Sequence, residues 1–388
     1  MAIMMSELSR DLVEEVLIRV PLTSLRAVRL TCKKLNDVSK DRSFIKKHIV
    51  EAKKKQVMNE FEMIMVMDYK VYLMNVDLHS NVDPYITLKG TLFSLKDDAN
   101  HHHHHQVDDI VGFFHCNGLL LCIIRNLNSR LVVWNPYFGE TRWIQPRSRY
   151  DMLDSYALGY DEKKKYKILR FVDDSYVFRE EERICEFELY SFESDSWKVV
   201  FDVPPEWKIE FNHRGLSVKG NTYWYATDRR GQDVAFLICF DFTTEKFGPC
   251  LPLPFNASPS CEDIVTLSSV GEEQFAVLFQ DDDTLRMEIW VTSKVQPTEV
   301  SWNKLFLVVD MGPLTGFAFL LGTFFIDQKK NVAMVFDKDY ASYSRGSAYI
   351  IGNNGYLEKV DFGKAADRSC YPFVSSYVLS TVQIRQLT

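Results

Sequence analysis

The first fifty residues alternate between apolar and polar positions with the period of a helix. Ser9 suits the N-cap of a first helix, and Pro21 ends it, because proline lacks an N–H and disfavours helical geometry in the residue before it. At about 100° per residue, charged residues fall on one side of this segment. Its apolar residues fall on the other broad side: Leu12, Val13, Val16, Leu17 and Val20.

A second helix is expected after Thr23, and a third short helix around residues 41–49. The second helix carries Leu30 on one side and an apolar stripe on the other, formed by Leu25, Val28, Cys32 and Leu35. One apolar side can close this small bundle, and another is left over. A unit of about 45 residues is marginally stable alone. The leftover face therefore packs on the rest of this chain or binds another protein, and we favour the second alternative.

From residue 61 onward the pattern is that of β-strands. Five segments have a strand–turn–strand layout, for example "LVVWNPYFGETRWI" and "FLICFDFTTEKFG", and each follows another apolar hairpin. In four of them an aromatic ring stands early in the second strand, at intervals of 54, 50 and 55 residues: Trp143, Trp197, Phe247 and Trp302. Four strands recurring at this spacing are typical of a propeller blade.

These five units predict five blades. Residues 61–90 contain most of a sixth, and a terminal strand at residues 376–384 is expected to complete it and close the ring. The predicted fold is therefore mainly β with a small N-terminal α module, namely three helices followed by a roughly six-bladed β-propeller of four-stranded blades. We expect the helical module at residues 1–50, a helical linker at 51–60 and the propeller at 61–388.

Charge divides the chain in the same way. Residues 1–55 carry 13 Lys/Arg against 7 Asp/Glu, so the basic head (+6) precedes an acidic body (−13) within the total of −7. No apolar signal segment follows the first Met, and residues 316–326 are too short to span a bilayer. The eight cysteines form no C-x-x-C pair, and we expect reduced thiols in a cytoplasmic or nuclear protein.

Motifs for catalysis or metal binding are weak. The five histidines at 101–105 have no organised Cys or carboxylate partners and are interpreted as a low-complexity loop. His115 beside Cys116 and Cys122 could activate a thiolate, but we interpret both cysteines as core thiols on one face of a hairpin. The acidic groups at 172–175, 179–183 and 281–283 are either solvated loops or a rim that attracts a basic substrate. We expect no catalytic residues, no metal and no cofactor.

The head resembles the F-box of plant proteins over about residues 6–49. Ser9 and Leu35 differ from the family, which usually has proline and tryptophan there. The matching residues follow the family's order and spacing: Leu8, Asp11, Leu12, Glu15, Val16, Leu17, Arg19, Val20, Pro21, Ser24, Leu25, Arg29, Cys32, Lys33 and Phe44.

The body is similar to the F-box-associated domain of the same plant proteins, over most of residues 61–384. The similarity rests on "GLLLC", "LVVWNP", "ALGYD", "KGNTYW", "ICFDFTTEKFG" and "VVFDKD" in the predicted repeats. Its kinship to kelch-type propellers is weaker, because the chain has no Gly-Gly pair.

These resemblances imply a non-catalytic substrate receptor of an SCF-type cullin–RING ubiquitin ligase. The head would bind a Skp-type adaptor and the propeller a protein substrate, with no nucleic acid or membrane partner. A non-degradative protein- or glycan-binding scaffold that retains the F-box is the alternative, and an enzymatic propeller is a further one. The resemblance assigns the adaptor contacts to Leu8, Leu12, Val16, Leu17, Pro21, Leu25, Val28, Cys32 and Leu35.

Overall fold

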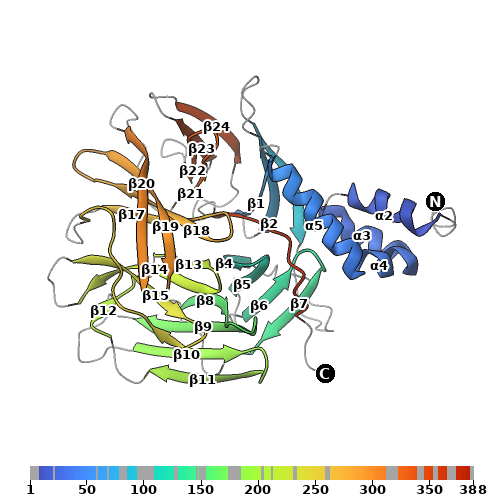
Figure 1. Cartoon of the computed structure of the whole chain (residues 1–388), viewed down its shortest axis with the longest axis horizontal. Helices are drawn as coiled ribbons and strands as arrows, with labels where there is room; N and C mark the ends of the chain where they lie inside the picture. Colours follow the sequence, from blue (N-terminus) through green and yellow to red (C-terminus); the bar gives the residue numbers. More distant parts are fainter. Residues whose placement is uncertain are drawn as a thin grey trace.

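The computed structural model shows a helical head beside a ring of β-sheets (Figure 1). It describes residues 8–384 except 21, 58–59, 68–69, 78–84, 94–108, 126–129, 146, 148–153, 174–184, 202–204, 211–212, 230–233, 258–262, 312–321, 339–344, 353–356 and 365–372. None of the helices formed by the described residues combines the length and the hydropathy needed to cross a bilayer.

The head contains four described helices rather than the three expected. They are α2 (Arg10–Ile18), α3 (Leu22–Thr31), α4 (Lys33–Ser39) and α5 (Arg42–Val57). The predicted second helix is interrupted at Cys32, whose backbone is extended (φ −159°, ψ 155°) and forms the N-cap of α4. Thr31 and Cys32 are both weak helix formers, so the break falls where helix propensity is low. Helix α5 runs to Val57 instead of ending near residue 49 and leads into the first strand.

Six antiparallel sheets form the propeller, one per blade, which confirms the predicted fold. Blade one combines β1 (Glu60–Met67), β2 (Lys70–Asp77) and β3 (Tyr85–Phe93) with β25 (Phe373–Ser376). Blade two contains β4 (Asp109–Cys116), β5 (Leu119–Arg125), β6 (Arg130–Asn135) and β7 (Glu140–Ile144). Blade three contains β8 (Ser155–Tyr160), β9 (Tyr166–Asp173), β10 (Cys185–Ser191) and β11 (Ser196–Phe201).

The remaining blades repeat this order. Blade four contains β13 (Leu216–Val218), β14 (Asn221–Asp228), β15 (Ala235–Asp241) and β16 (Lys246–Phe247), with β12 (Trp207–Lys208) also paired to β14. Blade five contains β17 (Ile264–Val270), β18 (Gln274–Gln280), β19 (Arg286–Gln296) and β20 (Glu299–Asp310). Blade six contains β21 (Thr323–Asp327), β22 (Val332–Lys338), β23 (Arg345–Gly352) and β24 (Leu357–Lys364).

The ring closes where β25 pairs antiparallel with β1, with Val66 opposite Phe373 and Met63 opposite Ser376. The prediction placed this closing strand at residues 376–384, which is wrong by about one strand length. The Tyr377 N–H still donates to the Glu62 carbonyl (3.1 Å), and beyond Tyr377 the chain leaves the sheet. It then runs to blade two, where the buried side-chain amide of Asn135 donates hydrogen bonds to the carbonyl groups of Ser380 and Val382.

Two repeated features explain why the sequence shows a period. Hairpin tips place Asn117, Lys164 and Lys219 in the left-handed region (φ 49°, 60° and 53°), which suits tight turns between strands. The periodic tryptophans join neighbouring blades. The Trp197 indole N–H donates to the carbonyl of residue 145 (2.7 Å), and the Trp302 indole N–H donates to the carbonyl of residue 252 (2.9 Å). Each accepting carbonyl lies just after the outer strand of the preceding blade.

Candidate protein-docking site on the helical head

Helix α2 has one apolar edge inside the head and another in solvent. Ser9 caps it as predicted, since its side chain accepts a hydrogen bond from the Leu12 N–H (3.4 Å). Val13 and Leu17 are fully buried, whereas Leu12 and Val16 remain 49% and 40% exposed. Leu12 and Val16 lie four residues apart, so they share one face of the helix. The broad apolar side predicted for this helix is therefore divided between the core and the surface.

A buried carboxylate joins α2 to α5. Glu14, which the helical pattern placed on the polar side, is buried and contacts Lys47 (2.6 Å) and Arg10 (3.1 Å). Hydrogen bonds from Lys47 and then Arg10 hold the pKa of Glu14 below its ordinary value. Arg10 also reaches Asp41 (3.0 Å), just before α5. Hydropathy alone cannot anticipate a buried ion pair, so the helical pattern gives no sign of this contact.

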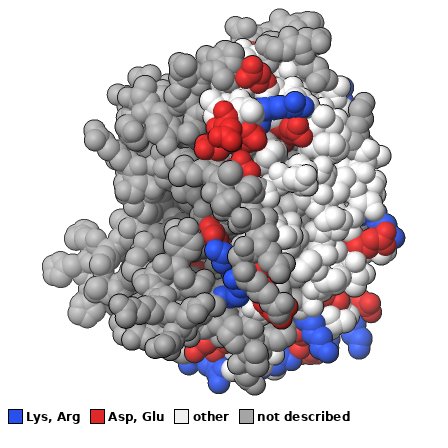
Figure 2. All heavy atoms as spheres, turned by 90° about the vertical axis from the view of Figure 1, so that its left-hand side faces the viewer, with Lys and Arg blue, Asp and Glu red and all other residues white. Residues whose placement is uncertain are grey.

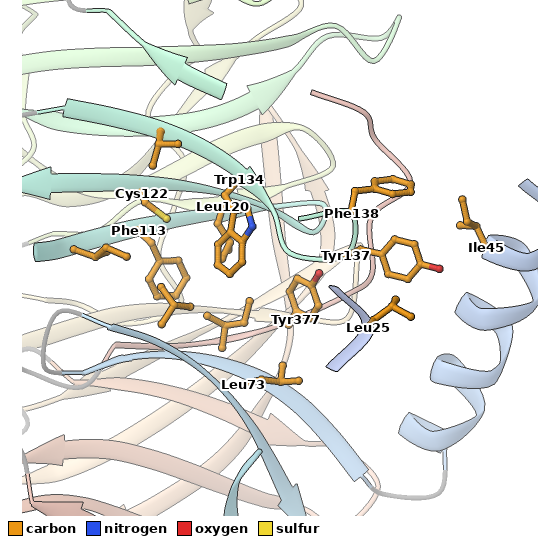
Figure 3. Packing of buried hydrophobic residues seen from close by; sticks show 14 of the residues in the cluster. Leu25, Ile45, Leu73, Phe113, Leu120, Cys122, Trp134, Tyr137, Phe138 and Tyr377 are labelled. Carbon is orange, nitrogen blue, oxygen red and sulfur yellow. The ribbon is translucent and has the colours of Figure 1, made fainter. Parts of the chain in front are cut away.

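The inner side of the head packs on the propeller. Leu25 and Ile45 share one hydrophobic cluster with Tyr137 and Phe138, which lie between β6 and β7 of blade two, and with Tyr377 near the C-terminus (Figure 3). Part of the apolar surface of the head is thus covered by this chain itself, which was the disfavoured alternative. The face that carries Leu12 and Val16 is not covered.

The structure separates the nine predicted adaptor contacts into three groups. Leu12 and Val16 are exposed, while Leu8, Val28 and Cys32 are partly buried against the head cluster. Leu17, Leu25 and Leu35 are buried in that cluster, and Pro21 lies outside the described residues. Leu30 on α3 was not among the nine, yet it is 79% exposed. The sequence does indicate the exposure of Leu30, because Leu30 lies on the side of the helix opposite the apolar stripe.

The cysteine and histidine candidates prove to be core residues. Cys116 and Cys122 are buried, and burial raises the pKa of each thiol to about 12. They do not share one face as predicted, because Cys116 pairs with Leu119 whereas Cys122 pairs with Phe113, so the two thiols enter different clusters. The His115 Nε2 accepts the Gly118 N–H (3.0 Å), and burial lowers the pKa of His115 to about 4.

The remaining polar candidates show no organised site. The histidines at 101–105 and the acidic group at 179–183 lie outside the described residues. Asp281 accepts hydrogen bonds from the N–H (2.7 Å) and hydroxyl (2.6 Å) of Thr284, so it caps a turn. Among the residues that the structure describes, no three His, Cys, Asp or Glu side chains form a metal-binding group. On the propeller face turned away from the head, the described acidic and basic side chains are interspersed (Figure 2).

A polar cavity of about 340 Å³ opens where the inner hairpin tips of blades two to five meet. Lys164 and Lys219 line it together with Glu272 and Glu273, and the wall also includes three serines, aromatic and apolar side chains and two glycines. The Lys164 ammonium lies 3.7 Å from the ring centroid of Tyr160, while Lys219 approaches Glu273 (4.0 Å). This lining mixes charged and polar groups with the apolar side chains of Leu216 and Val378, and so differs from the mostly apolar pocket with a few polar groups that is typical of enzyme sites.

The comparisons with known proteins agree with this two-part architecture. The F-box domain model matches residues 5–47, and the F-box associated beta propeller domain model matches residues 62–384. The chain is 66% identical to "F-box protein At5g42460" of Arabidopsis thaliana, covering 99% of each chain. It is 54% identical to "F-box/kelch-repeat protein At3g16740" of the same plant, covering 98% of this chain and 100% of that one.

Among solved structures, the chain is similar to the fungal lectin of Aleuria aurantia, a six-bladed β-propeller that recognises fucose. The TM-score is 0.44 at 10% identity, and the match covers 81% of this chain and 98% of that one. A similarity this distant assigns no ligand to the present chain.

A helical F-box head joined to a six-bladed propeller defines a class of two-part interaction protein. The chain belongs to the family of plant F-box proteins that carry an F-box-associated β-propeller domain.

Proposed function

We propose that this protein is the substrate receptor of an SCF-type cullin–RING ubiquitin ligase. One observation carries the proposal: the F-box head keeps Leu12 and Val16 in solvent on one helix face, although it buries or partly buries most of its other described apolar residues. Together with the exposed Leu30 of α3, they offer an apolar surface to the helices of a Skp-type adaptor.

The propeller would hold a protein substrate while the other ligase subunits carry out the ubiquitin chemistry. In this division of labour the chain contributes proximity, because a bound substrate reacts as part of one assembly. No nucleophile or general base of this chain is required. The polar cavity at the inner hairpin tips is one candidate contact surface, since its mixed Lys and Glu lining suits a polar peptide segment. The proposal includes a cytoplasmic or nuclear location, where the adaptor would meet the chain.

The test is affinity purification from plant cells treated with a proteasome inhibitor, comparing the wild type with the double variant Leu12→Asp/Val16→Asp. The matched control is Val199→Asp/Val308→Asp, which places the same two charges on propeller residues of similar exposure (45% and 39%). We expect the double variant to lose the adaptor and cullin but keep its other partners, and the control to keep both.

Two results would contradict the proposal. Retention of the adaptor by the double variant would show that this face is not the docking site. Co-purification of adaptor without cullin in the wild type would indicate a non-degradative scaffold instead.

A further inference from the structure

One turn of the propeller receives both the F-box head and the C-terminal segment. This turn, which we name the seat, is residues 135–139 between β6 and β7 of blade two. Arg29 of α3 is buried against it and donates hydrogen bonds to the Tyr137 carbonyl and to the Ser39 hydroxyl (2.9 Å). Its guanidinium carbon also lies 5.2 Å from the Tyr137 ring centroid and 5.9 Å from that of Phe138.

A second head residue contacts the same side chain. A ring nitrogen of His48 on α5 lies 3.2 Å from the Tyr137 hydroxyl, and both residues are buried. Helices α3 and α5 therefore contact one tyrosine from two directions. Because Arg29 carries its charge into a buried position, loss of its partners would leave that charge uncompensated.

Asn135 shapes the seat and also holds the C-terminal segment. Its side-chain oxygen accepts hydrogen bonds from the N–H groups of Tyr137 (2.9 Å) and Phe138 (3.3 Å). Its side-chain nitrogen donates to the carbonyls of Ser380 (3.2 Å) and Val382 (2.7 Å). The amide is fully buried, so a single side chain links the turn under the head to a segment some 245 residues later.

The C-terminal segment, residues 377–384, is fixed along its length. The Ile384 N–H donates to the Glu140 carboxylate (3.3 Å), and Tyr377 is buried in the cluster that the head joins. Gly118 permits the close passage, because a Cβ at that position would lie 2.4 Å from the Val378 carbonyl oxygen. The corresponding turn of blade four has a simpler role. Asp241 caps it by accepting the Thr243 N–H (2.8 Å) and the Thr244 hydroxyl (2.9 Å).

We propose that the seat and the C-terminal segment set the orientation of the F-box head on the propeller, with Asn135 and Arg29 as positioning residues. The consequence for ubiquitin transfer rests on the proposed function: a fixed head would present the propeller to the ligase at one angle. Only lysines within reach at that angle would then be modified, because transfer depends on how the reacting groups are held.

The sharpest perturbation exchanges asparagine and aspartate. Asn135→Asp keeps the oxygen that caps the turn and removes the donor to the C-terminal segment. Asp241→Asn is the matched control, because it makes the reverse change in the equivalent turn of blade four. In the full chain, we expect amide exchange of residues 377–384 and of α3 to rise about tenfold or more in Asn135→Asp, and to stay unchanged in the control.

Arg29→Ala tests the contact from the side of the head. We expect faster exchange in α3 and α4, with residues 377–384 still protected, and no change in Arg19→Ala, whose ion pair with Glu15 is exposed. Protection of blade five serves as the internal reference for global unfolding. If Asn135→Asp exposes the C-terminal segment but leaves α3 as protected as in Asp241→Asn, the segment does not position the head and the proposal fails.

The functional arm maps ubiquitin on the lysines of this chain itself, using the full chain with purified adaptor, cullin and RING subunits. We expect a restricted set of lysines in the wild type and a broader set in Asn135→Asp and Arg29→Ala. An unchanged pattern despite a loosened head would refute positioning. If the wild type binds no adaptor, the proposed ligase role fails, while the exchange measurements still decide whether the seat orients the head.

Discussion

The division of α2 into a buried and an exposed apolar edge predicts that stability and adaptor affinity can be separated by single substitutions. Leu17 is fully buried in the head, and truncating such a leucine to alanine removes its transfer free energy and leaves a cavity, at a cost of about 2–5 kcal/mol. Leu12 is 49% exposed, and its truncation should change stability by no more than roughly 0.5 kcal/mol.

Affinity should follow the opposite order. Complete burial of a leucine contributes about 1.5–3 kcal/mol, so covering the exposed half of Leu12 in a complex contributes about 1 kcal/mol. Leu12→Ala should therefore raise the Kd for a purified Skp-type adaptor about fivefold, and Leu12→Ala/Val16→Ala roughly thirtyfold. Titration calorimetry on the full chain measures the affinity, and amide exchange in α2 reports the stability of the head.

Either of two results would contradict this division of α2. If Leu12→Ala/Val16→Ala binds the adaptor as tightly as the wild type, the exposed edge is not the docking face. The division would also be wrong if Leu17→Ala weakens adaptor binding while the amides of α2 keep their wild-type protection from exchange, because a buried side chain would then contact the adaptor directly.

Three further results are expected. Gly118→Ala should lower the melting temperature more than Gly271→Ala. Both glycines have positive φ, but of the two only Gly118 has backbone atoms close enough to collide with an added Cβ. Equal effects would show that the C-terminal segment can shift to make room for the Cβ. The pKa of His115 is about 4 in the fold against 6.5 in the unfolded chain, so the stability it contributes is complete above about pH 6.5 and is lost as pH falls toward 4. In urea unfolding across this range, the free energy of unfolding of His115→Gln should therefore change less steeply with pH than that of the wild type. An identical pH dependence would exclude His115 as a source of the acid sensitivity. Trp302→Phe and Trp197→Phe each remove one indole donor between blades and should cost about 1 kcal/mol in denaturant unfolding, whereas no loss would make these bonds dispensable.

The propeller could be predicted because its repeat depends on residue types at local positions, namely the hairpin turns and the outer strands. Hairpin tips such as Asn117 and Gly118 require left-handed backbone, and two of the periodic outer-strand tryptophans, Trp197 and Trp302, bond to the preceding blade in the same way. The closing strand lies earlier than predicted, because residues 373–384 mix apolar residues with serine and threonine along their whole length and no position stands out as the start of a strand. The register of β25 is set by β1, more than 300 residues earlier, and the path of the residues after it is held by Asn135; neither contact is visible in the local pattern.

In the head, helical periodicity gave the helices but not their surroundings. The break at Cys32 has only weak local propensity behind it, and the burial of Glu14 depends on Lys47, which lies 33 residues away. The packing of Arg29 on Tyr137 joins positions 108 residues apart. Long-range contacts between side chains of different elements leave no periodic trace, so the orientation of the head on blade two could only come from the structure.

Blade one is assembled from both ends of the chain, and this has a consequence for synthesis. Until β25 has emerged from the ribosome, β1 presents an unpaired edge, because β25 is its partner on that side. Premature stop codons near the 3′ end of the message would consequently release a full-sized but open ring, vulnerable to edge-to-edge association and to quality-control proteases. For this protein, losing the residues from β25 onward should be nearly as damaging as losing an entire blade.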